Sequence, residues 1–138
     1  MPPTYRHRVR YHETDQQGFL FNSRHLEIAD VAMTEFLRGL GFPYADLVAG
    51  GTDVSVVRAV VDYMAPARFD DDLDVDTSCV RVGSSSFELV TLLRRGDRLL
   101  ARLQLVYVNV DADSARSTPL PDEVAAALRS VTVPDHDR

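Results

Sequence analysis

The chain has 138 residues, 45% of them hydrophobic and 26% charged, with a formal net charge of −6. We expect residues 1–138 to form a single domain with its core at about 4–120, because this length suffices for one substantial core. The negative charge argues against nucleic acid as the main partner, since phosphate binding requires clustered positive charge. All fifteen basic residues are arginine, so any phosphate contact must come from arginine or backbone N–H groups.

Membrane and secretion signals are not evident in the sequence. No stretch approaches the roughly 18 uninterrupted apolar residues of a membrane span, and the basic N-terminus lacks the apolar run of a secretory signal. Cys79 is the only cysteine, which excludes an internal disulfide and fits a reducing compartment. We therefore expect a cytoplasmic protein with no membrane partner, in which Cys79 is a small apolar strand residue and not a nucleophile.

A strand, a loop and a long helix are the first expected elements. Residues 4–11 alternate between two faces, which predicts a strand, and the polar stretch 12–18 predicts a loop. A helix should begin at Asn22 or Ser23, which are both good N-cap residues, and stop at Gly41. Its apolar residues cover about half of the circumference, so it should be deeply embedded. They are Leu26, Ile28, Ala29, Ala32, Met33, Phe36, Leu37 and Leu40.

Strands dominate the rest of the chain. Residues 42–52 should form a connection, followed by segments rich in β-branched residues at 53–64, 72–82, 86–95 and 99–110, with hairpin turns at 82–85 and 95–98. Within 72–82, Arg81 could share the face of Leu73 and Cys79. A short helix at about 121–131 and a frayed tail complete the chain. The pattern predicts an α+β fold in which an antiparallel sheet wraps around one central helix.

Metal and nucleotide motifs are missing from the sequence. It contains no HExxH, paired CxxC, P-loop, GxGxxG or serine elbow, and its four histidines (His7, His12, His25 and His136) show no metal-ligand spacing. We therefore expect no metal site. Chemistry would have to come from carboxylates, backbone dipoles and a few polar side chains.

The most informative segment runs from residue 11 to residue 23. Asp15 lies seven positions before Asn22, with Gly18 and the apolar run 19–21 between them. Exposing that run is costly, so it should line the core, a subunit interface or a ligand pocket. If the loop brings Asp15 to the helix start, free N–H groups there can hold developing negative charge while the carboxylate acts as base or nucleophile. On these residues alone, Glu13 and Asp15 could equally be solvated loop charges or cap the first turn.

Two stretches resemble the hotdog-fold acyl-CoA thioesterases of the 4-hydroxybenzoyl-CoA thioesterase-like family. The first is the run 8–18, Arg-Val-Arg-Tyr-His-Glu-Thr-Asp-Gln-Gln-Gly, with the helix that follows it. The second is 61–71, Val-Asp-Tyr-Met-Ala-Pro-Ala-Arg-Phe-Asp-Asp, which is similar to the family's Y-x-x-P-A-R-(aromatic)-D-D stretch. The resemblance covers roughly residues 5–120 and implies the hotdog fold, a five-stranded antiparallel sheet wrapped around one long helix.

The resemblance also implies a role for particular residues. Asp15 takes the position of the catalytic aspartate, and a backbone N–H at or next to Asn22 polarises the thioester carbonyl. Substrate-binding residues would be Gly18, Phe19, Phe21, Ser23 and His25, and CoA-binding residues Arg81, Ser84, Ser85 and Ser86. Family active sites lie between subunits, which implies a homodimer or homotetramer. The mechanism needs no metal or redox cofactor, and coenzyme A enters as part of the substrate.

The sequence departs from the family pattern at three points. Asn22 stands where the bacterial relatives closest to this pattern often have histidine, and an asparagine cannot shuttle a proton near neutral pH. His25 stands where many have tyrosine, which leaves its role open between structural placement and substrate contact. The turn at 82–86 has Arg81 as its only nearby cation, so CoA could bind through serine hydroxyls and backbone N–H groups, or the carrier could be a different one.

The expected function is hydrolysis of an acyl-CoA thioester to the free acid and CoA. Two alternatives remain open: release of an acyl or polyketide chain from an acyl carrier protein, and a non-catalytic acyl-CoA binding module. A dehydratase of related fold is less favoured, because the sequence suggests no strong histidine–acid arrangement.

Three further charged residues are interpreted as a structural cluster at a strand end: Arg68, Asp70 and Asp71. Arg58 is assigned no chemistry.

Overall fold

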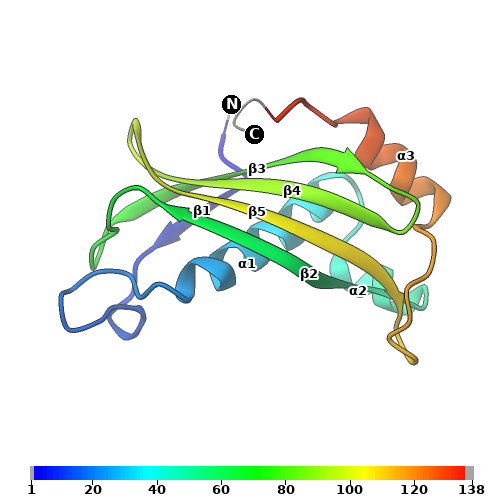
Figure 1. Cartoon of the computed structure of the whole chain (residues 1–138), viewed down its shortest axis with the longest axis horizontal. Coiled ribbons are helices and arrows are strands. Elements are labelled where there is room, and N and C mark those ends of the chain that lie inside the picture. The colour runs from blue at the N-terminus through cyan, green and yellow to red at the C-terminus, as the bar shows by residue number, and fades with distance from the viewer. Residues whose placement is uncertain (1, 136–138) are drawn as a thin grey trace.

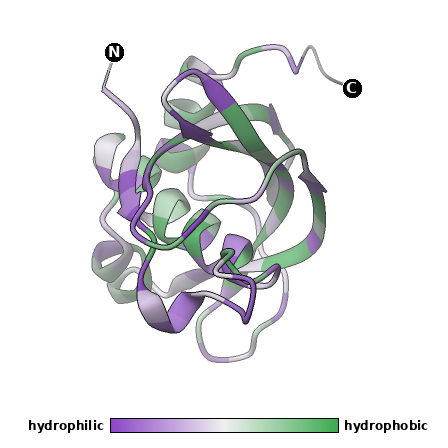
Figure 2. Cartoon of the chain, turned by 90° about the vertical axis from the view of Figure 1, so that its left-hand side faces the viewer, coloured by the Kyte–Doolittle hydropathy of each residue, from purple (hydrophilic) through white to green (hydrophobic). Residues whose placement is uncertain are grey.

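A curved antiparallel sheet wraps around a long helix in the computed structural model, which describes residues 2–135 (Figures 1 and 2). The strands are β1 (Tyr5–Arg8), β2 (Thr52–Tyr63), β3 (Asp72–Val82), β4 (Ser86–Arg95) and β5 (Arg98–Asp111). They pair antiparallel throughout, in the order β1-β3-β4-β5-β2. This is the hotdog arrangement, and the predicted fold class is confirmed.

The long helix α1 (Arg24–Gly39) fills the concave side of the sheet. Its buried face is centred on Ile28, Ala29 and Ala32, which are at most 2% exposed. Leu26 was expected in this buried face, but its side chain is 41% exposed. The predicted span of 23–40 is confirmed to within a residue at each end, because the apolar residues recur with the helical period.

Two expectations near the helix are wrong in detail. The first strand was predicted over 4–11, but β1 ends at Arg8 and residues 11–13 form a single 3-10 turn, η1 (Tyr11–Glu13). Tyr11, expected to alternate with the strand residues, is 83% exposed. The connection 42–52 contains a short helix, α2 (Tyr44–Ala49), which was not predicted. None of its residues is buried, so the sequence has no apolar stripe there that would indicate a helix.

Period-two burial defines the inner face of β3. Leu73, Val75, Thr77 and Cys79 are all buried there. A register shift between Cys79 and Arg81 interrupts the alternation of inward and outward side chains. Arg81 was expected to share the inner face, but its side chain is exposed. Burial raises the pKa of the Cys79 thiol, as expected of a structural cysteine.

The C-terminal segment packs back against β3. After α3 (Asp122–Ser130), the Val133 N–H donates to the Cys79 carbonyl at 2.9 Å, and Asp135 pairs with Arg102 at 2.6 Å. The predicted fraying is therefore wrong as far as residue 135, and residues 136–138 lie outside the described part. Among residues 2–135, no helix has the length and apolar character needed to cross a membrane.

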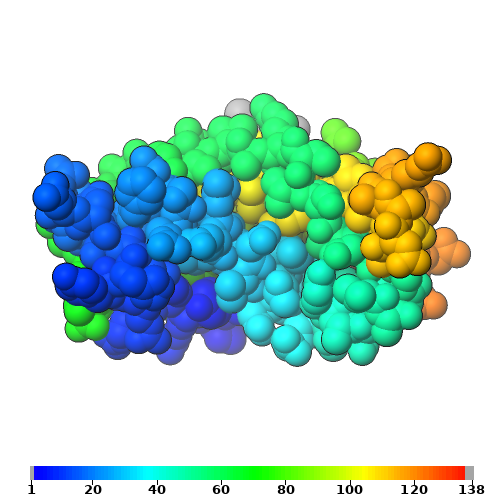
Figure 3. Space-filling model, turned by 90° about the horizontal axis from the view of Figure 1, so that it is seen from below, coloured from blue at the N-terminus to red at the C-terminus, as the bar shows by residue number. Residues whose placement is uncertain are grey.

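One edge of the sheet carries exposed apolar side chains. β2 lies at this edge, and residues 55–59 are all exposed along it, including Val56 at 46% and Val57 at 61%. Figure 3 shows the face of the molecule on which the N-terminal segment, α1 and α2 lie in a row next to β2. Unpaired backbone groups on such an edge are a template for pairing with another chain.

Candidate active site

A buried acid closes the turn that leads into the Asp15 loop. The Glu13 Oε1 accepts the Arg10 N–H at 2.7 Å and lies 2.9 Å from the His7 Nε2, while the Tyr5 hydroxyl lies 3.1 Å from His7 Nδ1. Burial alone would raise the pKa of Glu13, but these hydrogen bonds outweigh it and the pKa is lowered. Glu13 is 8% exposed, so it is not a solvated loop charge.

This network contains the histidine–acid pair that sequence reasoning overlooked. His7 and Glu13 are six residues apart and meet because β1 ends and η1 turns the chain back. Neither residue belongs to the walls of the two clefts that border Asp15. The pair therefore holds the loop and does not supply acid–base groups to those clefts.

The loop itself fixes one oxygen of the Asp15 carboxylate. Oδ1 accepts the Gln17 N–H at 2.8 Å and the Phe19 N–H at 3.3 Å. Gly18 makes the turn possible because its φ of 77° lies in the left-handed region, where a side chain is strained. Within residues 2–135, Oδ2 makes no hydrogen bond, and Asp15 is half-buried. One oxygen is thus oriented and the other is available to a ligand.

The apolar run 19–21 divides between the core and the site. Leu20 is 5% exposed and belongs to the core, with its N–H bonded to the Ala67 carbonyl at 2.8 Å. The Phe19 ring lies 4.7 Å from the Arg68 guanidinium carbon, and Phe21 is 45% exposed. The second family-like stretch therefore pairs with the Asp15 loop and positions it.

The strand-end cluster makes structural contacts. Asp71 pairs with Arg95 at 2.8 Å, and Asp70 and Asp72 both contact Arg8, at 3.4 and 2.7 Å. These contacts join β1, β3 and β4 beneath the loop. They agree with the structural interpretation of Asp70 and Asp71.

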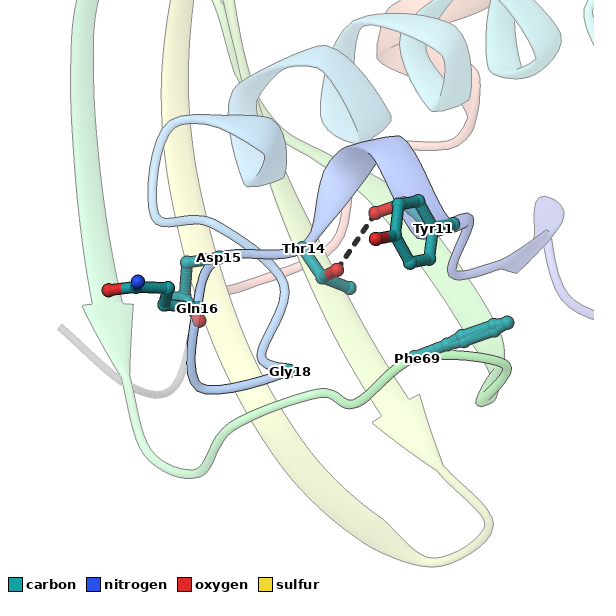
Figure 4. Close-up of a pocket in the computed structure, with 6 residues that line it drawn as sticks. All are labelled: Tyr11, Thr14, Asp15, Gln16, Gly18 and Phe69. Carbon is teal, nitrogen blue, oxygen red and sulfur yellow. Dashed lines mark hydrogen bonds between the residues drawn. The ribbon is translucent and has the colours of Figure 1, made fainter.

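Asp15 borders two clefts. The helix-start cleft, of about 320 Å³, lies at the beginning of α1. Its walls are Asp15, Phe19, Leu20, Phe21, Asn22, His25, Tyr63, Met64, Ala65 and Pro66. The loop cleft, of about 730 Å³, is lined by Tyr11, Thr14, Asp15, Gln16, Gly18 and Phe69 (Figure 4). In Figure 4, Tyr11 and Phe69 stand together, with Asp15 and Gln16 on the opposite side of the loop.

Free backbone donors lie at the start of α1. The N–H groups of Asn22 and Ser23 make no hydrogen bond to any residue in the range 2–135, and the helix dipole adds positive potential there. Asn22 lines the helix-start cleft, whereas Ser23 is absent from its walls. Ser23 occupies the N-cap position, but its backbone is helical and its side chain makes no cap bond, so the expected capping chemistry is not present.

His25 belongs to the same cleft. Its side chain is buried, at 4% residue exposure, and burial lowers its pKa. The ring packs edge-on to Tyr63 with centroids 4.8 Å apart. His25 is therefore structurally held and also part of the cleft wall. Tyr63, Met64 and Pro66 were missed as wall residues, although they lie within the 61–71 stretch that carried the resemblance.

The expected CoA-binding residues lie at the other end of the sheet in the same chain. The turn after β3 is far along that strand from the Asp15 loop (Figure 1). The carbonyls of Ser84 and Ser85 accept the N–H groups of Leu120 and Asn109. A hollow of about 520 Å³ contains the remaining two expected residues, and its walls include Arg58, Arg81, Ser86, Glu88 and Gln104. Arg58, to which the sequence pattern assigned no chemistry, also lines this hollow.

Among residues 2–135, no group of three or more His, Cys, Asp or Glu side chains is arranged so that it could hold a metal ion.

Comparison with known proteins agrees with this fold. The profile of the Thioesterase-like superfamily matches residues 9–128. The acyl-CoA thioesterase YbgC of Haemophilus influenzae is 31% identical over 122 residues, which cover 88% of this chain and 90% of that protein. A 1,4-dihydroxy-2-naphthoyl-CoA hydrolase of Acaryochloris marina is 25% identical, with 91% and 94% covered. A solved gentisyl-coenzyme A thioesterase has a TM-score of 0.83 at 27% identity, covering 91% of this chain and 98% of that one. The chain therefore belongs to the Thioesterase-like superfamily.

Proposed function

We propose that this protein is an acyl-CoA thioesterase, which hydrolyses a thioester to a free acid and coenzyme A. The observation that carries the proposal is the Asp15 carboxylate, with Oδ1 held by two backbone N–H groups and Oδ2 free, in a cleft shared with Asn22 at the start of α1. Relatives named as thioester hydrolases across most of the chain support the same reaction.

Hydrolysis can proceed with this chain's own groups. The Asp15 Oδ2 attacks the thioester carbonyl or removes a proton from the attacking water, and the carbonyl oxygen gains negative charge. The N–H groups of Asn22 and Ser23 stabilise that charge, assisted by the helix dipole. The C–S bond then breaks and the CoA thiolate leaves. In the base route, Asp15 passes the proton taken from water to the thiolate, and the acid is released directly. In the nucleophilic route, the acyl group is left on Asp15 as an anhydride, which a water molecule hydrolyses to the acid, supplying the proton that the thiolate takes up. No metal or redox cofactor is required.

The helix-start cleft is the proposed acyl site. Its walls are largely apolar, with Phe19 and Phe21 contributed by the loop, so the acyl group replaces water against aromatic surface. Gly18 and Ser23 complete the proposed substrate contacts, and His25 contributes to substrate binding as part of the cleft wall that it forms with Tyr63. For CoA, we propose that Arg81, Ser84, Ser85 and Ser86 bind the phosphates, with Arg58 as a second cation in the same hollow.

We further propose a homodimer, or a tetramer built from dimers, in which two β2 edges pair. Tyr63 lies at the Asp15 end of β2 and Thr52 at the opposite end, just after the end of α2. Antiparallel pairing of two β2 strands would therefore carry the turn after β3 of one protomer toward Asp15 of its partner. This would unite the acyl and CoA sites that lie apart within one chain.

The cytoplasm is the proposed location, since the single cysteine is buried and unpaired.

A thiol-release assay tests the proposed reaction. Purified protein is incubated with short, long and aromatic acyl-CoAs, and free CoA is measured together with the released acid. We expect catalytic release from at least one substrate class, with acid and thiol in equal amounts. Tight acyl-CoA binding without thiol release from any substrate would favour a non-catalytic binding module and contradict the proposal.

An acyl carrier protein remains the second candidate source of the thioester. The hollow near the turn after β3 offers two arginines, Arg58 and Arg81, but it also contains the acidic Glu88, which weakens phosphate attraction. Matched acyl-CoA and acyl-carrier substrates separate the two sources. We expect a higher kcat/KM for acyl-CoA, and the reverse order would assign the protein to carrier release.

A further inference from the structure

The carbonyl oxygen of Asn22 receives two side-chain hydrogen bonds. The Tyr63 hydroxyl donates to it at 2.6 Å, and His25 Nδ1 lies 3.1 Å from it. One donor comes from the end of β2 and the other from the first turn of α1. Their rings support each other edge to face, at an interplanar angle of 86°. A single peptide group at the helix start is thus held from two elements.

The hydrogen bond fixes the tautomer of His25. A carbonyl oxygen can only accept, so Nδ1 must carry the hydrogen. Burial lowers the pKa of the ring, so the neutral Nδ1–H form dominates near neutral pH, and His25 donates there without bringing a charge into the cleft wall. The residue that departs from the family pattern therefore has a defined hydrogen-bonding role.

Holding the carbonyl also anchors residue 22 itself. Asn22 lines the helix-start cleft, and its own N–H makes no hydrogen bond within residues 2–135. The Ser23 N–H points opposite to the held carbonyl, and Ser23 is absent from the cleft walls. The donor that the two bonds help to place is therefore the Asn22 N–H. Stabilisation of a developing oxyanion depends on donors whose orientation is set before the reaction.

We infer that Tyr63 and His25 are positioning residues, which anchor Asn22 at the start of α1 so that its free N–H keeps a fixed orientation as an oxyanion donor. The inference rests on the proposed thioesterase function. Neither side chain is assigned contact with the reacting atoms. The alternative is that Tyr63, which is 53% exposed, is only a wall of the acyl site or binds the substrate through its hydroxyl.

Kinetics separates positioning from substrate binding. Tyr63→Phe keeps the ring and removes the donor, and His25→Phe removes the other donor. Because the lost bonds act through the peptide, kcat and kcat/KM should fall together by about tenfold, with KM within about twofold. This loss is smaller than the hundredfold or more typical of deleting an oxyanion donor. Tyr44→Phe is the matched control, since it removes a tyrosine hydroxyl that bonds Asp53, and it should leave kcat unchanged.

A spectroscopic readout tests the peptide without using activity. Asn22–Ser23 is the only Asn–Ser step in the sequence, so labelling with carbonyl-¹³C asparagine and ¹⁵N serine gives one cross-peak linking that carbonyl to the Ser23 amide. Loss of a hydrogen bond shields the carbonyl carbon, so its signal should move upfield in Tyr63→Phe and in His25→Phe. It should stay in place in Tyr44→Phe.

The two readouts together decide the inference. An upfield shift with a loss in kcat at constant KM supports positioning. An unmoved signal, a moved signal with unchanged kcat, or a rise in KM alone would each overturn it. The proposed function fails separately: an Asp15→Asn variant with undiminished turnover would refute it even where the carbonyl signal moves as expected.

Discussion

The buried carboxylate of Glu13 accepts the Arg10 N–H and the His7 ring. Glu13→Gln preserves the size but removes the charge, so both hydrogen bonds weaken inside a largely dry site. We expect the free energy of unfolding to fall by about 1–3 kcal/mol, measured by urea denaturation. Glu27→Gln is the control, because that side chain is 60% exposed beside Arg24 and should change stability by less than about 0.5 kcal/mol. Equal losses in the two variants would contradict the assigned role.

His25 makes stability depend on pH. Burial lowers its pKa in the folded state below the ordinary value of 6.5, whereas the unfolded chain keeps that value. As pH falls below 6.5 the unfolded state binds the proton first, so the free energy of unfolding decreases until the folded-state pKa is reached. Denaturation at a series of pH values should show this slope in the wild type. His25→Phe should flatten it, and an unchanged slope would argue against the buried neutral ring.

At the level of elements, the Asp15 loop depends on one left-handed residue. Gly18 has a φ of 77° and open space where a Cβ would project, so Gly18→Ala costs backbone strain alone, about 1–2 kcal/mol. Because the strain falls on the loop that orients Asp15, kcat should drop as well. Gly39→Ala, within α1 and also unobstructed, should be neutral or slightly stabilising. Melting temperatures and turnover of both variants check this, and a harmless Gly18→Ala would contradict it.

Most elements could be predicted from their apolar residues and from the turn residues between them. The strands at 72–82 and 86–95 agree with β3 and β4 residue for residue. Alternate side chains are buried in β3, whereas β4 buries five residues in a row, and its bounds follow from the predicted turns on either side. The end of β1 could not be predicted, because it depends on Glu13 folding back onto the Arg10 N–H. The helix α2 could not be predicted either, since six residues without a buried side chain carry no apolar pattern.

The candidate site was predictable in part. Asp15, Asn22 and the aromatic residues of the loop were identified through the 8–18 stretch, and the structure brings them together in one cleft. Tyr63 was not identified, because its bond to the Asn22 carbonyl joins residues 41 positions apart. The turn that carries Ser84 and Ser85 is separated from Asp15 within the chain, so that part of the site depends on the proposed dimer.

At the scale of the whole molecule, the β2 edge is expected to bring two copies together. Val57→Asp places a charge at the exposed centre of that edge, which should dissociate the dimer and abolish most turnover while leaving the fold intact. Val48→Asp, at an exposed position of α2, should leave the mass in solution unchanged. Sedimentation velocity and circular dichroism measure both outcomes. A Val57→Asp protein that keeps the wild-type mass would refute assembly through β2.

The most direct test of the account is the turnover number of Asp15→Asn on the best acyl-CoA substrate. The amide oxygen can still accept the Gln17 and Phe19 N–H groups, so the loop should hold its shape, but the side chain can no longer act as base or nucleophile. We predict a fall in kcat of at least about a hundredfold with the fold and assembly preserved, and no change for Asp46→Asn on exposed α2. An Asp15→Asn enzyme that turns over at nearly the wild-type rate would contradict the assignment of this carboxylate to catalysis.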